Sequence, residues 1–152
     1  MAKNIYESLR ESHELQRSLC RRLLRAKPES GRREEVLREL RIELAAHAAA
    51  EERFLYAPIL MHDMGLNSSR HALAEHHDID ECVEELQKAD YEGGSWLAKA
   101  KELSHQVHHH LREEETKFFQ VSGKILTDAQ KVNLARKYEK DYERMKGVFG
   151  AG

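Results

Sequence analysis

The stretch LSHQVHHHLREEETKFFQV, residues 103–121, carries the pattern that decides the fold. Within it, one stripe of residues recurs at intervals of four, three, four, four and three positions, which is the period of one α-helix face. The members of the stripe are Leu103, Val107, His110, Glu114, Phe118 and Val121. A histidine and a glutamate therefore stand in the middle of a face that ordinarily carries apolar side chains into a core. The stretch predicts an amphipathic helix with a polar pair inside its core face.

Three earlier segments show the same spacing, and each has one histidine near the middle of its stripe. We expect the first to be a helix over about residues 4–26, because Pro28 marks its end. The second follows Gly31 and is closed by Pro58 and Gly65. The third begins near the cap candidates at residues 67–69, and the turn YEGGS at residues 91–95 separates it from the fourth. The three stripes are Ile5, Leu9, His13, Gln16, Cys20 and Leu23; Leu37, Leu40, Leu44, His47, Glu51 and Leu55; and Ala72, His76, Ile79, Val83 and Leu86.

The composition favours a single all-α domain over residues 1–152. The chain has only 8 Gly and 2 Pro but 40% hydrophobic residues, so breakers are too few for many short strands and apolar residues too many for disorder. Four long helices joined by short turns predict an up-down-up-down bundle over about residues 2–122. A capping box from Thr127 to Gln130 predicts a fifth helix over about residues 127–147. This C-terminal helix is either an appendage or an interface element.

Charge and hydropathy argue against several classes of partner. With 25 Lys and Arg against 27 Asp and Glu, the net charge is −2, and no block of like charge indicates a nucleic-acid or anionic-membrane surface. The longest apolar stretch, residues 54–61, is far short of the roughly 20 residues of a membrane span. The first residues, MAKNIYESLRESHE, carry charges where a signal peptide is apolar, so we expect a cytoplasmic protein. Cys20 and Cys82 fit that compartment as reduced core residues.

Histidine is unusually frequent, with 10 copies against 4 Phe and 1 Trp. Four histidines lie on the core stripes, and two of these are followed one turn later by a glutamate. A buried carboxylate is costly unless it is paired or binds a metal. Four imidazoles and two carboxylates from four helices match the ligand demand of a non-haem iron site. The candidate metal ligands are His13, His47, Glu51, His76, His110 and Glu114.

The spacing within each histidine–glutamate pair has a mechanical reason. Residues four apart lie on one helix face with Cβ atoms about 6 Å apart, so both side chains reach the same ion or adjacent ions. A carboxylate has two oxygens and bridges metal ions roughly 3.5–4 Å apart, whereas each imidazole supplies one terminal nitrogen. The candidate set therefore suits two ions better than one.

Helical phase separates the candidate ligands from the other histidines. The chain has five pairs with the spacing His-x-x-x-Glu, but only those at His47 and His110 lie on an apolar stripe. The remaining histidines fall on polar faces, where solvated side chains are expected. Among them, His105 and His109 are one turn apart with His108 nearby, which is a spacing suited to adventitious zinc or nickel. The histidines on polar faces are His62, His71, His77, His105, His108 and His109.

The sequence resembles the hemerythrin-like HHE cation-binding family over nearly its whole length. The segments that carry the resemblance are SHELQRSLCRRLL, HAAAEERFLYAPIL, AEHHDIDECVEEL and HHHLREEETKFFQVSGKIL. The family's order of ligands, H, HxxxE, H and HxxxE on successive helices, falls on the six candidates. Tyr56 after Glu51 and Phe119 after Glu114 match its flanking aromatics. The resemblance implies a four-helix bundle around an oxo- or hydroxo-bridged di-iron centre, with the two glutamates as bridging ligands.

Two departures separate the sequence from the oxygen-carrying hemerythrins. Those proteins have an HxxxH pair on the third helix, whereas the position four before His76 is Ala72. They also place an Asp five residues after the last histidine, whereas this chain has Glu114 at four. One terminal ligand is therefore missing, to be supplied by His71 or His77 if the helix is distorted, or by water. An open position favours access of a substrate or peroxide over stable reversible oxygen binding.

The expected function is that of a di-iron protein that senses, stores or buffers iron, oxygen or reactive species, with dioxygen or peroxide as its small ligand. Manganese and zinc are alternative metals. A di-iron peroxidase or oxidase that uses the open position is a second hypothesis, so the question of enzymatic activity stays open. A third is a helical interaction module with a structural metal, whose C-terminal helix pairs with a partner or a second copy. We expect the chain to be either a monomer or a homodimer that forms through the C-terminal helix.

Overall fold

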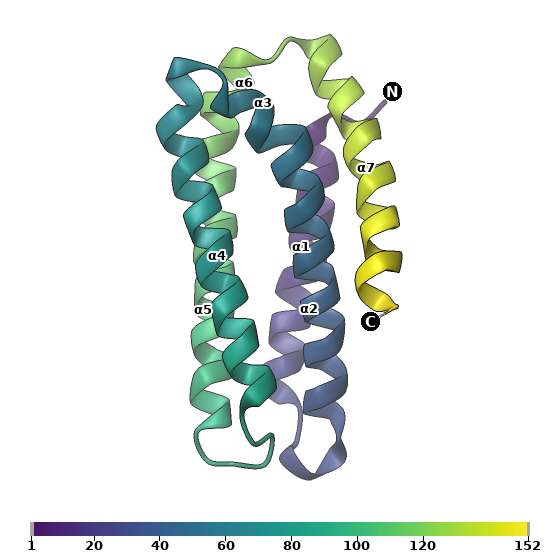
Figure 1. Ribbon diagram of the computed structural model, residues 1–152, viewed down its shortest axis with the longest axis vertical. Coiled ribbons are helices and arrows are strands. Elements are labelled where there is room, and N and C mark those ends of the chain that lie inside the picture. The colour runs from purple at the N-terminus through teal and green to yellow at the C-terminus, as the bar shows by residue number, and fades with distance from the viewer. Residues whose placement is uncertain (1, 152) are drawn as a thin grey trace.

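The computed structural model describes residues 2–151, which form helices without any strand (Figure 1). Four long helices lie side by side, and each runs antiparallel to the next along the chain. They are α1 (Ile5–Arg25), α2 (Arg32–Glu51), α4 (Leu66–Lys88) and α5 (Trp96–Glu113). Within the described residues, no helix has an apolar stretch long enough to cross a membrane. The predicted all-α, up-down-up-down bundle is confirmed.

The two helices that carry a His-x-x-x-Glu pair on their core stripe each widen into a π-helical turn at the glutamate, where the spacing predicted plain α-helix. α2 continues through the π turn Glu52–Tyr56 into α3 (Ala57–Leu60), and α5 continues through Glu114–Phe118 into α6 (Phe119–Ile125). The wider turn lets both the fourth and the fifth residue after each glutamate face the core. These buried residues are Leu55 and Tyr56 after Glu51, and Phe118 and Phe119 after Glu114.

The return from α3 into α4 is tighter than expected. α4 begins at Leu66, directly after the 3-10 turn Asp63–Gly65. The cap candidates predicted at residues 67–69 therefore lie inside the first turn of α4, and that prediction is wrong. Gly65 allows the tight turn because a Cβ there would collide with the side chain and carbonyl of Ile59.

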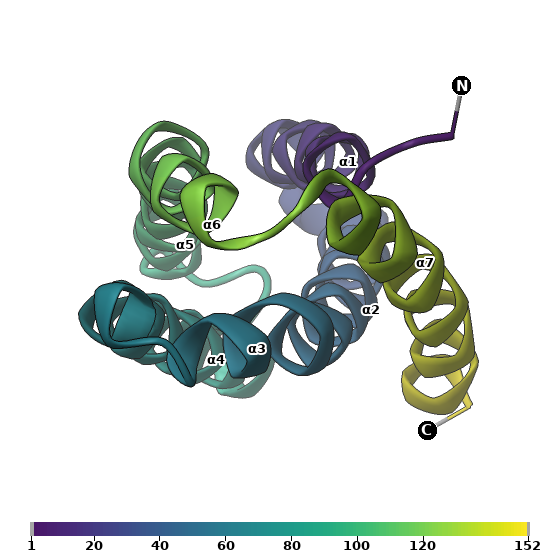
Figure 2. The ribbon, with the colours of Figure 1, turned by 90° about the horizontal axis from the view of Figure 1, so that it is seen from above.

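The C-terminal helix α7 (Asp128–Gly150) packs along the outside of the bundle against α1 and α2 (Figure 2). It begins at the predicted capping box, in which Thr127 Oγ1 accepts a hydrogen bond from the Gln130 amide at 3.1 Å. It ends at Gly150, slightly beyond the expected end at about residue 147. Its buried residues include Tyr138 and Met145, so α7 covers one side of the bundle.

The core consists of two apolar clusters with a polar layer between them. The cluster nearer the α1–α2 and α4–α5 turns includes Leu19, Leu23, Leu37, Leu40, Val83, Leu86, Trp96, Leu103 and Val107. The cluster at the other end includes Ile5, Leu9, Leu55, Tyr56, Ile59, Ala72, Phe118, Phe119 and Tyr138. Along each long helix, the histidine of the core stripe comes between residues of the two clusters. The apolar layers therefore hold the histidines in the interior, away from water.

Removal of a side chain from the apolar cluster near the turns tests how far the bundle depends on it. Leu40 is fully buried, so Leu40→Ala leaves a cavity and is expected to lower the free energy of unfolding by about 2–5 kcal/mol. Leu15 on α1 is 38% exposed, and Leu15→Ala is expected to change it by less than about 0.5 kcal/mol. Urea unfolding of metal-free protein measures both values. Equal effects of the two substitutions would contradict the assigned core.

Candidate metal centre

The six candidate ligands converge in the polar layer at the middle of the bundle. All six residues are buried, none more than 7% exposed. Their ligand atoms form two groups, each with all its atoms within 4.8 Å of one another. One group consists of His13, His47, Glu51 and Glu114, and the other of Glu51, His76, His110 and Glu114. Each histidine belongs to one group, whereas both glutamates belong to both.

Distances between the inward-facing atoms suit metal ligands. His47 Nε2 lies 3.2 Å from Glu51 Oε1, and His13 Nε2 lies 3.2 Å from Glu114 Oε1. In the second group, the Nε2 atoms of His76 and His110 are 3.1 Å apart. Neighbouring donor atoms around an octahedral ion with bonds of about 2.1 Å are themselves about 3 Å apart. The separations between donor atoms therefore match those around a shared ion.

The outward nitrogen of every candidate histidine has a partner that fixes the ring. His13 Nδ1 donates to Glu115 at 2.7 Å, and His76 Nδ1 donates to Glu52 at 2.8 Å. His110 Nδ1 donates to Glu75 at 2.8 Å, and His47 Nδ1 bonds the hydroxyl of Tyr138 on α7 at 2.7 Å. A metal-bound histidine typically uses its second nitrogen in this way, which orients the ring and makes the ligand nitrogen more basic. All four rings therefore present Nε2 to the centre.

Buried atoms without partners are concentrated at the same place. Eight buried side-chain nitrogen and oxygen atoms of the described residues have no hydrogen-bond partner, and five of them belong to the candidate ligands. The five are the Nε2 atoms of His13 and His47, both carboxylate oxygens of Glu51, and Oε1 of Glu114. Buried polar atoms are nearly always satisfied, and an ion bound between these atoms would satisfy all five at once. The residues present therefore fit a metal centre.

Positive and negative groups strongly perturb one another in this layer. Burial lowers the pKa of His13, but its pairs with Glu114 and Glu115 outweigh burial and raise the pKa to about 9. Burial also lowers the pKa of His76, but pairs with Glu51 and Glu52 raise it to about 10. Without metal, the imidazoles of His13 and His76 are therefore protonated at neutral pH, and their positive charge stands where metal cations would otherwise be.

The two shared glutamates differ in charge preference. Burial and the neighbouring negative charge of Glu51 raise the pKa of Glu114. Burial alone would raise the pKa of Glu51, but the adjacent His47, together with contacts to Glu114 and His76, outweighs burial and lowers this pKa. Two carboxylates so close together and so deeply buried call for positive charge between them, which metal cations would supply.

Comparison with known families and structures agrees with this geometry. The family model of the hemerythrin HHE cation binding domain matches residues 4–121. The chain belongs to the hemerythrin HHE family. A crystal structure of a hemerythrin HHE cation binding domain-containing protein from Mycobacterium kansasii is similar to it, with a TM-score of 0.86 and 26% sequence identity. None of the curated proteins compared matches the sequence.

The similarity to the M. kansasii structure extends beyond the family's own domain. The aligned region covers 96% of this chain and 89% of that chain, whereas the family model ends at residue 121. Because 96% coverage leaves only a few residues unmatched, the common fold reaches into α7. In this hemerythrin-family chain, α7 also supplies Tyr138, which contacts the candidate centre through His47.

The two candidates for an extra ligand lie outside both buried groups. His71 is exposed, and its Nε2 lies 2.9 Å from Glu113 at the surface. His77 is exposed and pairs with Glu81 at 2.9 Å. At the position where oxygen-carrying hemerythrins have a histidine, Ala72 is buried without a polar side chain.

A tyrosine hydroxyl lies beside the second group of ligands. The Tyr56 hydroxyl donates a hydrogen bond to Glu114 and lies 3.4 Å from His76 Nε2. The π turn after Glu51 brings this side chain inward. Sequence reasoning noted Tyr56 only as a flanking aromatic, because α-helical phase places a residue five positions after Glu51 on a different face. The π turn is therefore the feature that adds an oxygen to the second group.

Sequence reasoning also missed the residues that orient the histidines. Glu52, Glu75 and Glu115 look like ordinary surface glutamates, and Tyr138 looks like a residue of an accessory helix. Glu52 and Glu115 each directly follow a shared glutamate, which was the one available signal for them. Hydrogen-bonding partners from other helices depend on the packed fold, so helical periodicity within one segment does not reveal them.

Tyr138→Phe tests whether α7 supports the centre. The Tyr138 hydroxyl bonds His47 Nδ1 and Ser12 Oγ, each at 2.7 Å, so its loss frees the His47 ring. Loss of such a partner is expected to weaken metal binding about 10- to 100-fold while the fold is retained. Competition with a chelator measures the affinity. Tyr142→Phe is the control on the same helix, because that hydroxyl bonds Glu43 and no candidate ligand. Similar losses in the two variants would contradict the role of Tyr138.

Proposed function

We propose that this hemerythrin-family chain binds two iron ions and senses, stores or buffers iron, oxygen or reactive species. The observation that carries the proposal is the arrangement of two histidine pairs around two shared glutamates. His13 and His47 would hold one ion, and His76 and His110 the other. Glu51 and Glu114 would bridge them, since each lies in both groups.

The chain's own residues prepare this centre before any ion is bound. Glu52, Glu75, Glu115 and Tyr138 hold the imidazole rings in place, and the apolar clusters on either side keep bulk water away. When bound, a pair of irons supplies reversible one-electron chemistry and affinity for dioxygen-derived ligands. Tyr56 adds a hydroxyl oxygen beside His76, which we assign as a further ligand or as the donor that positions Glu114.

Iron analysis of reconstituted protein tests the proposal. Protein loaded with ferrous iron and then desalted is expected to retain two iron ions per chain, since each buried group offers four ligand residues. Fewer than one iron per chain would overturn the proposal. Parallel loading with manganese and zinc shows which metal the centre prefers.

The raised pKa values of two ligand histidines predict a steep pH dependence of metal affinity. Metal binds neutral imidazole, so the protons on His13 and His76, with pKa values of about 9 and about 10, must leave when metal binds. Affinity is therefore expected to rise from about pH 6 to about pH 9, whereas an unperturbed histidine site levels off near pH 7. Chelator competition across this range measures it. A plateau at neutral pH would contradict the assignment.

The same raised pKa values determine whether the metal-free protein gains or loses stability as the pH rises. A histidine whose pKa rises on folding stabilises the fold fully below its unfolded pKa of about 6.5. That contribution is lost as pH rises through the folded values of about 9 and about 10. Metal-free protein is therefore expected to lose stability over this alkaline range.

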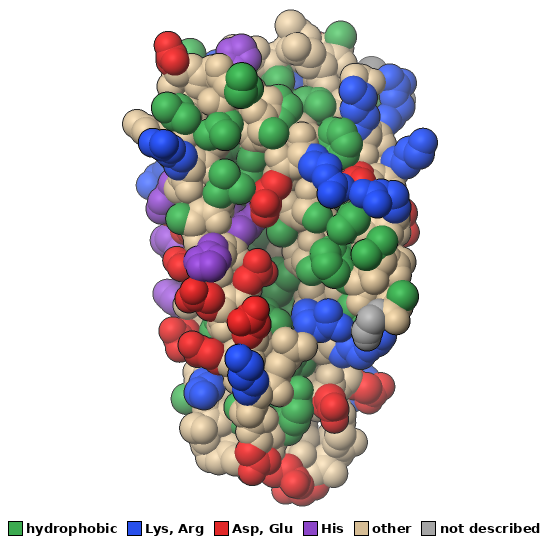
Figure 3. All heavy atoms as spheres, viewed as in Figure 1, with side chains coloured by type: hydrophobic (Ala, Val, Ile, Leu, Met, Phe, Trp, Pro, Cys, Tyr) green, Lys and Arg blue, Asp and Glu red, His purple; other side chains and the backbone are tan. Residues whose placement is uncertain are grey.

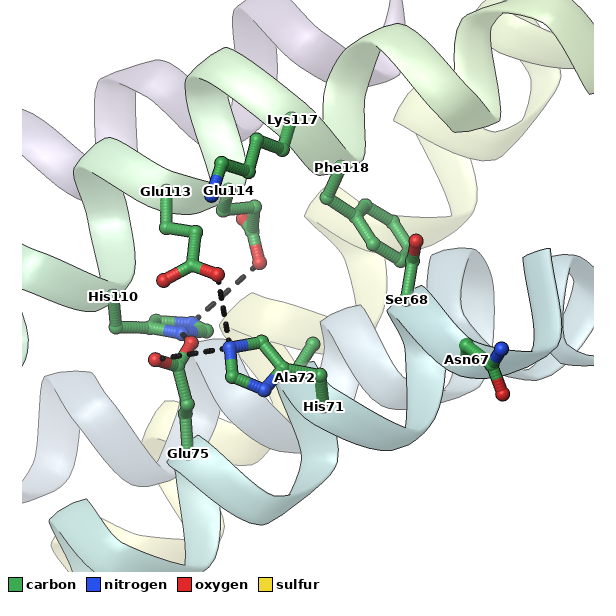
Figure 4. A pocket seen from close by; sticks show the side chains of 10 residues that line it. All are labelled: Asn67, Ser68, His71, Ala72, Glu75, His110, Glu113, Glu114, Lys117 and Phe118. Carbon is green, nitrogen blue, oxygen red and sulfur yellow. Dashed lines mark hydrogen bonds and ion pairs between the residues drawn. The ribbon is translucent and has the colours of Figure 1, made fainter.

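Peroxide consumption is a second candidate function, favoured by a pocket that reaches the centre. A cavity of about 260 Å³ is lined by His110 and Glu114 at its inner side and by Asn67 and Lys117 elsewhere (Figure 4). It gives a small molecule a route to the second group of ligands. Turnover of hydrogen peroxide by the iron-loaded protein, lost in His110→Ala, would support this function. Absence of turnover would leave binding or sensing as the role.

A further inference from the structure

A second cluster of histidines and glutamates lies at the surface between α4 and α5. His71 Nε2 is 2.9 Å from Glu113 and 3.5 Å from Glu75. His109 Nε2 is 2.9 Å from the other oxygen of Glu113 and 3.6 Å from the same Glu75 oxygen. Each carboxylate therefore lies between the two imidazoles. These four residues form what we call the outer cluster.

The outer cluster differs from an ordinary surface ion pair. His71–Glu75 and His109–Glu113 are each one helical turn apart, and the antiparallel packing of α4 on α5 brings the two pairs together. By contrast, the similar pair His77–Glu81 on α4 stands alone. His71, Glu75 and Glu113 offer ligand atoms that all lie within 4.8 Å of one another, and the second imidazole, that of His109, lies against both carboxylates. Imidazole and carboxylate groups suit a divalent first-row metal ion, and the exposed histidines leave these groups accessible from water. Figure 3 shows histidines and acidic side chains gathered over α4 and α5.

A shared carboxylate connects the outer cluster to the buried centre. Oε2 of Glu75 faces His71 and His109, while its Oε1 accepts the hydrogen bond from His110 Nδ1 at 2.8 Å. Figure 4 shows Glu75 in this position, between His71 and His110.

The pocket provides a route between the two places. His71, Glu75 and Glu113 line the same pocket as His110 and Glu114, and the carboxylates give it negative charge on both sides. A positive side chain, Lys117, also lines it. A cation held at the outer cluster would therefore lie beside the opening that leads to two candidate ligands.

We propose that the outer cluster captures a divalent first-row metal cation and delivers it through this pocket to the buried centre. Capture depends only on the four residues of the outer cluster, two exposed histidines and two half-buried glutamates. Delivery rests on the function proposed above, since it requires the buried residues to bind metal. Local negative charge that concentrates a cation near its destination raises association rates, by roughly 10- to 1,000-fold in focused sites.

Cobalt(II) binding to the full chain tests both parts. The key variant is His71→Asn with His109→Asn, which removes both imidazoles and leaves Glu75 and the buried groups unchanged. Glu113→Gln is a second variant of the same cluster. The matched control is His77→Asn, because His77 is an exposed histidine paired one turn from a glutamate on α4 and lies outside the cluster. Equilibrium dialysis counts all bound cobalt, and a brief chelator wash followed by desalting counts the cobalt retained in the interior.

The unmodified chain and His77→Asn are expected to bind one more readily removed cobalt ion than the double variant. In the double variant, the chelator-resistant cobalt is also expected to accumulate at least about tenfold more slowly, because the outer cluster no longer concentrates the cation beside the pocket. Equal cobalt counts in all proteins would overturn the outer site. If the outer ion is bound but the buried cobalt accumulates at the same rate in all proteins, delivery is overturned.

If the buried centre binds no metal, none of the proteins retains cobalt after the chelator wash. That result is the failure of the proposed function, and it is distinguishable from the other two results.

Discussion

Glu51→Ala is expected to remove both metal ions at once, lowering the iron content from two ions to less than one per chain. Glu51 belongs to both ligand groups, and its Oε1 lies 3.2 Å from His47 Nε2 and 3.3 Å from His76 Nε2. Loss of a carboxylate that belongs to both groups is therefore expected to affect each ion. His47→Ala, which changes the first group alone, is expected to spare the ion of the second group. Metal analysis after reconstitution and desalting measures both results.

A buried glutamate outside the groups serves as the matched control for Glu51. Glu43 is two turns earlier on α2 and only 2% exposed, and it accepts hydrogen bonds from Gln16 and Tyr142. Glu43→Gln is expected to retain the full iron content. Full iron content in Glu51→Ala, or equal loss in the two variants, would show that Glu51 is not a shared ligand.

Removal of the metal is expected to lower the melting temperature substantially. Metal that binds the folded chain at a free concentration of about 1,000 times its Kd stabilises it by about 4 kcal/mol. For a chain of this size that corresponds to roughly 10 °C or more. The physical reason is that the unpaired atoms of His13, His47 and Glu51 lose the cation that satisfies them. Calorimetry before chelation, after chelation and after metal is returned measures the shift.

Glu51→Ala provides the control for this thermal experiment. A variant that binds no metal is expected to melt at one temperature whether metal is added or chelated. Leu40→Ala, which lowers stability through the apolar core, is expected to retain the metal-dependent shift. If chelation left the melting temperature of the unmodified chain unchanged, the centre would not bind metal in the folded protein.

Helical phase was enough to predict which residues meet in the middle of the bundle. His76 and His110 lie on apolar stripes, whereas the neighbouring His77 and His109 lie a third of a turn away, and the structure buries only the first two. The number and direction of the long helices also follow from the same stripes, because short turns force antiparallel neighbours.

The features that phase did not predict depend on backbone adjustment or on packing between helices. Tyr56 lies beside the ligands because a π turn follows Glu51, and no local residue preference predicts such a turn. Tyr138 contacts His47 because α7 folds back across α1 and α2. The outer cluster requires α4 and α5 to place two surface pairs opposite each other. Each of these depends on tertiary structure that a single helical segment does not encode.

The most direct test of the central claim is an anomalous difference map at the iron absorption edge from crystals of the reconstituted protein. We predict two peaks inside the bundle, one beside the Nε2 atoms of His13 and His47 and the other beside those of His76 and His110. Glu51 and Glu114 are expected to lie within bonding distance of both. A single interior peak, or iron bound only at surface histidines, would contradict the account.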